Sequence, residues 1–255
     1  METRLTIDWI SITSHGVGGW VGYSSHPSLG TGDDWILTNG KNGYNEGAKH
    51  ALGVSTYRNL NRPDMGKHTI YSGKSLQKID QQHNVTPFDI LAWHIGKSDN
   101  ITRLDIALDF IDSTLTVQQF IDAYEAKQCF TPLKSASEIR TINHEGHTFY
   151  IGSTKKRKKL MRIYDKKAES KTDYPWVRAE AQIMGKPATN LSRQMINGDN
   201  IKTVMLGALY DICHFPTIET WSKAIDERVD IKLSNDTESL SKTRDWLEKT
   251  VFGCI

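Results

Sequence analysis

The sequence predicts an α+β domain with one largely antiparallel central sheet, polar on one face and covered by helices on the other. Segments in which polar and apolar residues alternate, as they do in strands, are mixed along the chain with segments of helical periodicity. The chain has 255 residues, of which 38% are hydrophobic, so it can bury a substantial core. It contains no internal repeat and no low-complexity tract.

The first part of the chain predicts strands, glycine-rich turns and two helices. Residues 1–45 contain strands and turns, and Leu5, Ile7 and Trp9 alternate in the first strand with Thr6, Asp8 and Ile10. Residues 67–83 predict a strand that ends at Gly73, followed by a short helix. Residues 87–96 predict a helix with proline in its first turn and glycine at its end.

The middle of the chain contains the clearest strand pattern, at residues 100–112. Thr116–Lys127 has the apolar stripe of an amphipathic helix, and residues 137–153 predict a hairpin that turns at Glu145–Gly146. Two more strands are expected at 159–167 and 176–185.

The last part is mainly helical in pattern, at residues 192–209 and 218–226. A polar stretch then leads to a final predicted helix at residues 240–252. We therefore expect one main domain over residues 1–226, and a polar connector with a C-terminal helix over residues 227–255.

Composition excludes several classes of protein. The chain has no run of about eighteen apolar residues, so no membrane span is expected, and its start lacks the apolar region of a signal peptide. Cys129, Cys213 and Cys254 are widely spaced and lack the spacing of a zinc site. Reduced thiols in the cytoplasm are therefore expected.

Positive charge is concentrated in one segment. Residues 153–171 hold nine basic and two acidic side chains, whereas the rest of the chain holds 23 basic and 28 acidic ones. Such a segment on a mildly acidic body is typical of a polyanion site, most often one for nucleic acid. A solvated basic loop or a targeting tract is the alternative interpretation.

Three predicted strands each have one apolar row and one row rich in polar and charged side chains. The polar rows contain Arg103, Asp105, Ala107 and Asp109; Arg162, Tyr164 and Lys166; and Arg178, Glu180 and Gln182. A sheet with one solvated face gives such alternation by itself. Aspartate is a poor strand former, however, so Asp105 and Asp109 are costly there unless cationic groups lie opposite them.

These carboxylates predict a site for Mg²⁺ or Mn²⁺, which prefer oxygen ligands. Asp105 and Asp109 stand about 13 Å apart on a regular strand, too far to share one ion. We therefore expect one of them to pair with Glu180, and the other to orient an arginine or a lysine.

Three segments in this order resemble the replication initiation factor family, Rep_trans: "TRLDIALDF", "GHTFYIGSTKKRKKLMRIYDKKAE" and "WVRAEAQ". The resemblance is strongest from Thr102 to Gln182. That family includes rolling-circle initiators of small plasmids and of some filamentous phages, and related relaxases of conjugative elements. Its members commonly continue past the final helix, so a chain that stops at Ile255 is expected to be a short or truncated member.

The resemblance implies a catalytic nicking and joining domain over residues 1–226, with Tyr164 as the residue that becomes linked to the 5′ phosphate of nicked DNA. Asp105, Asp109 and Glu180 match acidic positions of the family. The His-hydrophobe-His metal motif of better-known nicking enzymes is absent from the sequence. His144 and His147 fall at the predicted hairpin turn, where a plain polar turn is favoured over a metal site.

The expected chemistry is transesterification with Mg²⁺ or Mn²⁺ as cofactor. A phenol with a pKa near 10 is a weak nucleophile, and we expect Arg162 and Lys166, on the strand face of Tyr164, to lower that pKa. Attack by Tyr164 leaves a 5′-phosphotyrosine and a free 3′-hydroxyl. The expected DNA-binding residues are Lys155, Lys156, Arg157, Lys158, Lys159, Lys167, Arg103 and Arg178.

Alternatives are a relaxase of the same family, a non-enzymatic origin-binding repressor, and a nuclease in which water attacks and Tyr164 only packs. Two other phenols lie nearby, Tyr150 on a hairpin strand and Tyr174 in a loop. The expected partner is single-stranded or cruciform origin DNA. The resemblance also implies a host helicase, a homodimer, and a bacterial cytoplasmic protein encoded by a plasmid, phage or mobile element.

Overall fold

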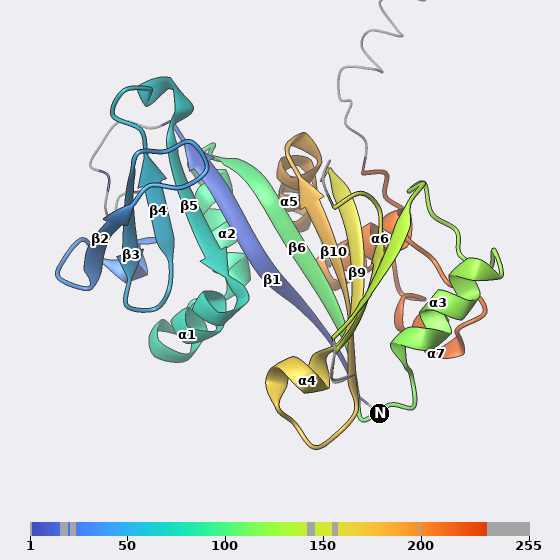
Figure 1. Ribbon diagram of the computed structural model, residues 1–255. Helices are drawn as coiled ribbons and strands as arrows, with labels where there is room; N and C mark the ends of the chain where they lie inside the picture. The colour runs from blue at the N-terminus through green and yellow to red at the C-terminus, as the bar shows by residue number, and fades with distance from the viewer. Residues whose placement is uncertain are drawn as a thin grey trace, which may run out of the picture.

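A computed structural model describes residues 2–15, 20, 24–141, 146–154, 158–198 and 200–233. It contains one ten-stranded sheet with the order β2-β3-β4-β5-β1-β6-β10-β9-β8-β7 (Figure 1). The strands are β1 (Glu2–Ser14), β2 (Trp35–Asn39), β3 (Glu46–His50), β4 (Ser55–Arg58), β5 (Lys67–Ser72), β6 (Asn100–Ile111), β7 (Ala136–Arg140), β8 (His147–Ile151), β9 (Lys159–Asp165) and β10 (Trp176–Met184). Neighbouring strands are antiparallel throughout, which confirms the predicted α+β class.

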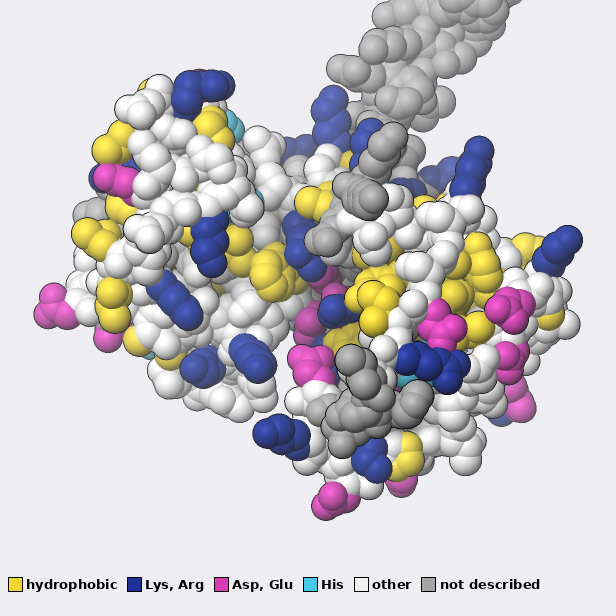
Figure 2. All heavy atoms as spheres, in the orientation of Figure 1, with side chains coloured by type: hydrophobic (Ala, Val, Ile, Leu, Met, Phe, Trp, Pro, Cys, Tyr) yellow, Lys and Arg dark blue, Asp and Glu magenta, His cyan; other side chains and the backbone are white. Residues whose placement is uncertain are grey.

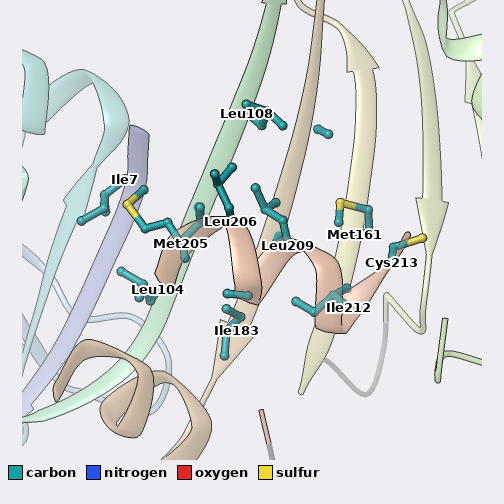
Figure 3. Close-up of a cluster of buried hydrophobic side chains, with 14 of the residues drawn as sticks. Ile7, Leu104, Leu108, Met161, Ile183, Met205, Leu206, Leu209, Ile212 and Cys213 are labelled. Atoms are coloured by element: carbon teal, nitrogen blue, oxygen red, sulfur yellow. The ribbon is translucent and has the colours of Figure 1, made fainter. Parts of the chain in front are cut away.

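Helices cover one face of the central strands. The helices are α1 (Gly73–His83), α2 (Pro87–Gly96), α3 (Val117–Glu125), α4 (Lys166–Ser170), α5 (Lys186–Asn197), α6 (Ile201–Ile212) and α7 (Glu219–Ala224). Of these, α2, α5, α6 and α3 pack on β1, β6, β10, β9 and β8. Figure 1 shows α2, α5 and α6 behind these strands and α3 to their right. The core lies between them, where Leu104 and Ile183 of the sheet meet Leu206 and Leu209 of α6 (Figure 3).

Local signals in the sequence explain where most helices begin. Thr86 and Thr116 each cap the first turn of a helix, α2 and α3, and both form a capping box with the residue three positions later. The helical run predicted over 192–209 is divided into α5 and α6. Asn200 accepts a hydrogen bond from the Thr203 amide, so a new helix begins there.

The strand predicted over residues 159–167 is shorter than expected. It ends at Asp165, whose side chain accepts a hydrogen bond from the Lys167 amide and caps α4. Lys166 is therefore the first residue of a short helix and not a member of the strand row that contains Tyr164.

The alternation predicted for the first strand is wrong beyond Ile7. Ile7 pairs with Ile106 and Trp9 with Asp105, so a β-bulge leaves Asp8 as an extra residue on β1. The bulge places Asp8 and Trp9 on the polar face together, and it sends Ile10 into the core. A slip of one residue exchanges the two faces of a strand, which explains the reversal.

Some predicted features lie outside the described residues. These are the C-terminal helix at 240–252, most of the hairpin turn with His144, the thiol of Cys254, and the basic side chains of Lys155, Lys156 and Arg157. Cys129 and Cys213 carry free thiols. Residues 229–233 pack on α6, where the Val229 amide donates to the Thr203 carbonyl and Leu233 is buried. Within the described ranges, no helix has the length and apolarity needed to span a membrane.

Candidate active site

The register of the central strands aligns polar side chains in rows across the sheet. One row contains Arg4 of β1, Asp109 of β6, Arg178 of β10 and Tyr164 of β9. The next row contains Thr6, Ala107, Glu180, Arg162 and Tyr150, and a third contains Trp9, Asp105, Gln182 and Leu160. Residues more than 50 positions apart in the sequence thus become neighbours on one face.

A solvated face was the alternative interpretation of this alternation, and the centre of the face is not solvated. Asp105, Asp109, Glu180 and Arg178 are all buried, with Asp109 0% exposed. Their cover comes from long side chains of the same face, because Arg103 lies over the ring of Trp9 and Arg4 lies over the ring of Trp176. Figure 2 shows acidic and basic side chains side by side in the hollow beside the part of the molecule built on β2–β5.

Tyr164 has its hydroxyl in the middle of the charged cluster. The hydroxyl donates to Oε2 of Glu180 at 3.3 Å and accepts from Nζ of Lys166 at 3.5 Å. The guanidinium of Arg162 lies 4.5 Å from the ring centroid. Tyr164 is buried, yet it is not part of the hydrophobic cluster that forms the core, and its hydroxyl is hydrogen-bonded to charged groups.

The pKa of Tyr164 contradicts one expectation from the sequence. Burial raises this pKa well above 10, and the negative charge of Glu180 adds to the rise, whereas Arg162 and Arg178 oppose it. Adjacent cations by themselves therefore do not produce a phenolate in this protein. An acceptor for the phenolic proton, or a further positive charge beside Glu180, is needed to activate Tyr164.

Glu180 connects the phenol to the arginines. Its Oε2 accepts from Nη2 of Arg162 at 2.6 Å as well as from Tyr164. Lys166 forms an ion pair with Glu169 of α4 at 2.9 Å. The helix thus holds a lysine over the Tyr164 hydroxyl, although Lys166 does not belong to the strand.

Both carboxylate oxygens of Asp109 accept hydrogen bonds from neighbouring side chains. Its oxygens accept from Nε and Nη2 of Arg178 at 2.6 and 2.8 Å, from Nε1 of Trp176 at 2.7 Å and from Nη2 of Arg4 at 3.1 Å. Burial raises the pKa of Asp109, but the bonds and charge of Arg178 outweigh it, and the pKa is lowered overall. The geometry matches the role of an aspartate that orients an arginine.

Asp105 lies in the third row, next to Arg103. Oδ1 of Asp105 accepts from Nε of Arg103 at 2.8 Å, and the same guanidinium lies 4.4 Å from the ring centroid of Trp9. Burial raises the pKa of Asp105 to about 7, Arg103 opposes the rise, and the charges of Glu180 and Asp8 add to it. The negative charges of Glu180 and Asp8 therefore make ionisation of the buried Asp105 less favourable.

Asp8 is a site residue that the sequence reasoning missed. Its Oδ1 accepts from Nη1 of Arg178 at 2.5 Å, and burial raises its pKa, to which Glu180 also contributes. A side chain on Gly73 would bring a Cβ to 2.7 Å from Oδ1 of Asp8, so glycine leaves the space that Asp8 fills. Aspartate within a strand was the signal that singled out Asp105, and the same signal is present at Asp8.

The remaining predicted DNA-binding residues are divided between two faces. Lys167 on α4 and Lys158, just before β9, are exposed. Lys159 faces the helices, where its Nζ forms an ion pair with Asp211 of α6 at 3.2 Å. The structure therefore brings Arg103 and Arg178 to Tyr164's face, and Lys159 to the other.

Comparison with known proteins identifies the family of this chain. The sequence model of the replication initiation factor family, Rep_trans, matches residues 99–253 of the chain. The chain belongs to this replication initiation factor family. A search of curated proteins found no significant match.

The fold of this replication initiation factor also has a solved counterpart. The structure of a rolling circle replication initiator protein from Geobacillus stearothermophilus is similar, with a TM-score of 0.71 and 19% sequence identity. The similarity covers 96% of each chain. The family match begins after β1, so Arg4, Asp8 and Trp9 lie outside it and enter the site through the sheet.

The carboxylates of this family member have the donor chemistry of a hard divalent cation. Mg²⁺ is usually held by one or two carboxylates together with substrate phosphates and waters. One of Asp105 and Asp109 was predicted to pair with Glu180, and the contacts of Asp109 leave Asp105 for that role. The charges of Glu180 and Asp8 both raise the pKa of Asp105. Among the described residues, no group of three or more histidine, cysteine or acidic side chains forms a preassembled metal site. The residues therefore fit an ion that needs few protein ligands.

Proposed function

We propose that this replication initiation factor starts rolling-circle replication by nicking one strand of origin DNA with Tyr164, and that it later rejoins the strand. The observation that carries the proposal is the hydrogen bond from the Tyr164 hydroxyl to Glu180, with Arg162 and Lys166 on either side. The fold similarity to a rolling circle replication initiator supports it.

In the proposed reaction the phenolic oxygen of Tyr164 attacks the scissile phosphorus. The bond from phosphorus to the 3′ oxygen breaks as the bond to the tyrosine forms, which leaves a 5′-phosphotyrosine. Glu180 accepts the phenolic proton through the existing hydrogen bond, and the leaving 3′ oxygen takes up a proton from water to become a free hydroxyl. The reverse reaction rejoins the strand without ATP, because the phosphotyrosine bond conserves the energy of the phosphodiester.

Cations around the tyrosine stabilise the charge of the phosphate in this reaction. Arg162 and Lys166 are the nearest, and Arg178 lies in the row of Tyr164. We assign Asp109 to positioning, because its contacts with Arg178, Arg4 and Trp176 use both of its oxygens.

We propose Asp105 and Glu180 as the residues that hold Mg²⁺ or Mn²⁺, with Asp8 adding negative charge to the same buried region. A bound divalent cation would polarise the scissile phosphate as a Lewis acid and would lower the pKa of a nearby hydroxyl. The raised pKa values of Asp8 and Asp105 support the assignment, since a cation at this position compensates the negative charge that is buried there. That the protein recruits a host helicase and that it forms a homodimer remain predictions.

The test is covalent capture. The protein is incubated with Mn²⁺ and single-stranded oligonucleotides that tile the origin of its own replicon, and the products are separated on a denaturing gel. We expect a protein band shifted by covalent DNA, which is lost in Tyr164→Phe and retained in Tyr150→Phe. Tyr150 is the matched control, because it lies on the same face beside Arg162.

Two outcomes would contradict the proposal. Cleavage without a covalent adduct would favour a nuclease in which water attacks. Binding of the origin without cleavage, with and without Mn²⁺, would favour a repressor. In Glu180→Gln we expect the adduct to be lost or greatly reduced, because the acceptor of the phenolic proton is removed.

A further inference from the structure

An aromatic pair lies at the end of the polar face, next to Tyr164. Arg178 of β10 is paired with Tyr164 of β9, and Trp176 is two residues before Arg178 on the same face. The strand spacing and the rise per residue place the Cα atoms of Trp176 and Tyr164 roughly 8 Å apart. Tyr174 precedes Trp176 in the loop that joins α4 to β10.

The ring of Trp176 is held in place from several sides. Its Nε1 donates to Oδ1 of Asp109 at 2.7 Å, which fixes the orientation of the indole. The guanidinium of Arg4 lies 5.0 Å from the ring centroid, and that of Arg178 lies at 5.9 Å. Two arginines and a buried aspartate thus make Trp176 a rigid support.

Tyr174 stacks on this support and remains open to solvent. The two ring centroids are 6.2 Å apart with an angle of 24° between the planes. Tyr174 is 42% exposed. An exposed ring that is held on a supported one offers surface to a ligand, and its place beside Tyr164 distinguishes it from other exposed rings.

The surroundings favour a polyanionic ligand with flat groups. Lys167 of α4 and Lys171 of the loop are exposed cations, the loop also carries the exposed Asp173, and Arg4 is exposed beside Trp176. Aromatic rings among cations form the platforms on which the bases of single-stranded nucleic acids stack. Such stacking tolerates many sequences, because every base has a π face.

We propose that Tyr174, supported by Trp176, binds an unpaired nucleobase one or two nucleotides from the scissile phosphate. The location relative to the nick rests on the proposed function, since Tyr164 defines where the phosphate lies. The role of the platform is to select an extruded single strand over a duplex, in which bases are already stacked on one another. Trp176 acts as a positioning residue.

The test separates the base from the backbone of the ligand. Binding of a fluorescently labelled oligothymidine is compared by anisotropy with binding of an abasic strand of equal length, without metal. We expect wild-type protein to prefer oligothymidine, and Tyr174→Ala to reduce this preference by about 5- to 10-fold. Tyr174→Phe should keep the preference, because stacking needs the ring and not the hydroxyl.

The matched control is Phe130→Ala. Phe130 is also an exposed aromatic residue that stacks on a neighbour, His214, but it lies at an isolated bridge next to the end of α6. Its loss should leave the preference unchanged. An equal preference in wild type and Tyr174→Ala would overturn the proposal, as would a decrease of the same size in Phe130→Ala.

A second measurement locates the contact. Oligonucleotides with 5-iodouracil are photo-cross-linked to the protein, and the modified peptide is identified by mass spectrometry. A cross-link at Tyr174 or Trp176 supports the platform, and cross-links confined to other residues would overturn it. The two proposals fail in different ways. If no covalent adduct forms but the base preference is present, the proposed function is wrong and the platform stands. If the adduct forms but Tyr174→Ala does not change the base preference, only the platform is wrong.

Discussion

Substitution of Asp109 tests whether this aspartate holds the arginines or binds the metal. In Asp109→Asn the side chain keeps its shape and loses its charge, and one oxygen acceptor becomes a donor. Arg178 is buried and donates to Asp109 through two nitrogens, at 2.6 and 2.8 Å. The remaining partner of Arg178 is Asp8, at 2.5 Å. In the variant, the buried positive charge of Arg178 is therefore balanced by Asp8 alone of these two aspartates.

The size of the effect follows from these contacts. Removal of one partner of a buried ion pair costs about 3–5 kcal/mol in free energy of unfolding. Because Asp8 still compensates Arg178, we expect the lower end, about 3 kcal/mol. With an m-value of about 3 kcal/mol/M for a chain of this size, the urea midpoint should fall by about 1 M.

The assay is urea unfolding followed by circular dichroism, with and without Mn²⁺. Asp64→Asn is the control, because Asp64 forms an exposed ion pair with Arg62, and its midpoint should not change measurably. Mn²⁺ should raise the midpoints of wild type and Asp109→Asn equally, and it should have less effect on Glu180→Gln. A midpoint within about 0.2 M of wild type, or loss of the Mn²⁺ effect in Asp109→Asn, would refute the assignment of Asp109 to positioning.

Two further predictions concern the buried charge and the packing of α6. Burial raises the pKa of Asp105 to about 7 from its usual value of 3.8, so ionisation of Asp105 lowers stability as the pH rises between these values. In Asp105→Asn the urea midpoint should fall less between about pH 5 and about pH 8 than in wild type, and equal decreases would contradict the raised pKa. Gly207→Ala should cost about 1–3 kcal/mol, because its Cβ would clash with the Val229 carbonyl oxygen, whereas Gly96→Ala has open space and should be neutral or slightly stabilising. Thermal melts of both variants check this, and the reverse order would show that residue 229 does not pack on α6.

Much of the fold could be predicted from local patterns. The alternation in residues 100–112 and 176–185 gave β6 and β10 within one or two residues, and the proline and glycine of residues 87–96 gave α2. The polar rows of these strands were also correct, because side-chain direction on a strand depends only on the position along it. Burial of the polar face could not be predicted, since the covering side chains of Arg4 and Trp9 come from a strand about 100 residues away.

Local capping also decided features that alternation could not. Lys166 continues the period of the strand in the sequence, but Asp165 caps a helix at that point. Lys166 nevertheless contacts the Tyr164 hydroxyl, but it does so from the first turn of α4 and not from the strand. For Lys159, the charge favoured DNA, whereas the strand direction turned the side chain toward Asp211.

The sequence by itself determined which residue types line one face of each central strand, and it placed Tyr164 among cations, because both follow from neighbours a few positions apart. Only the tertiary structure decided that Glu180 meets the Tyr164 hydroxyl and that Asp8 joins the site. Strand order, register and the bulge at Asp8 are fixed by hydrogen bonds between distant segments together with the burial of the apolar face, and no local pattern in the chain encodes them.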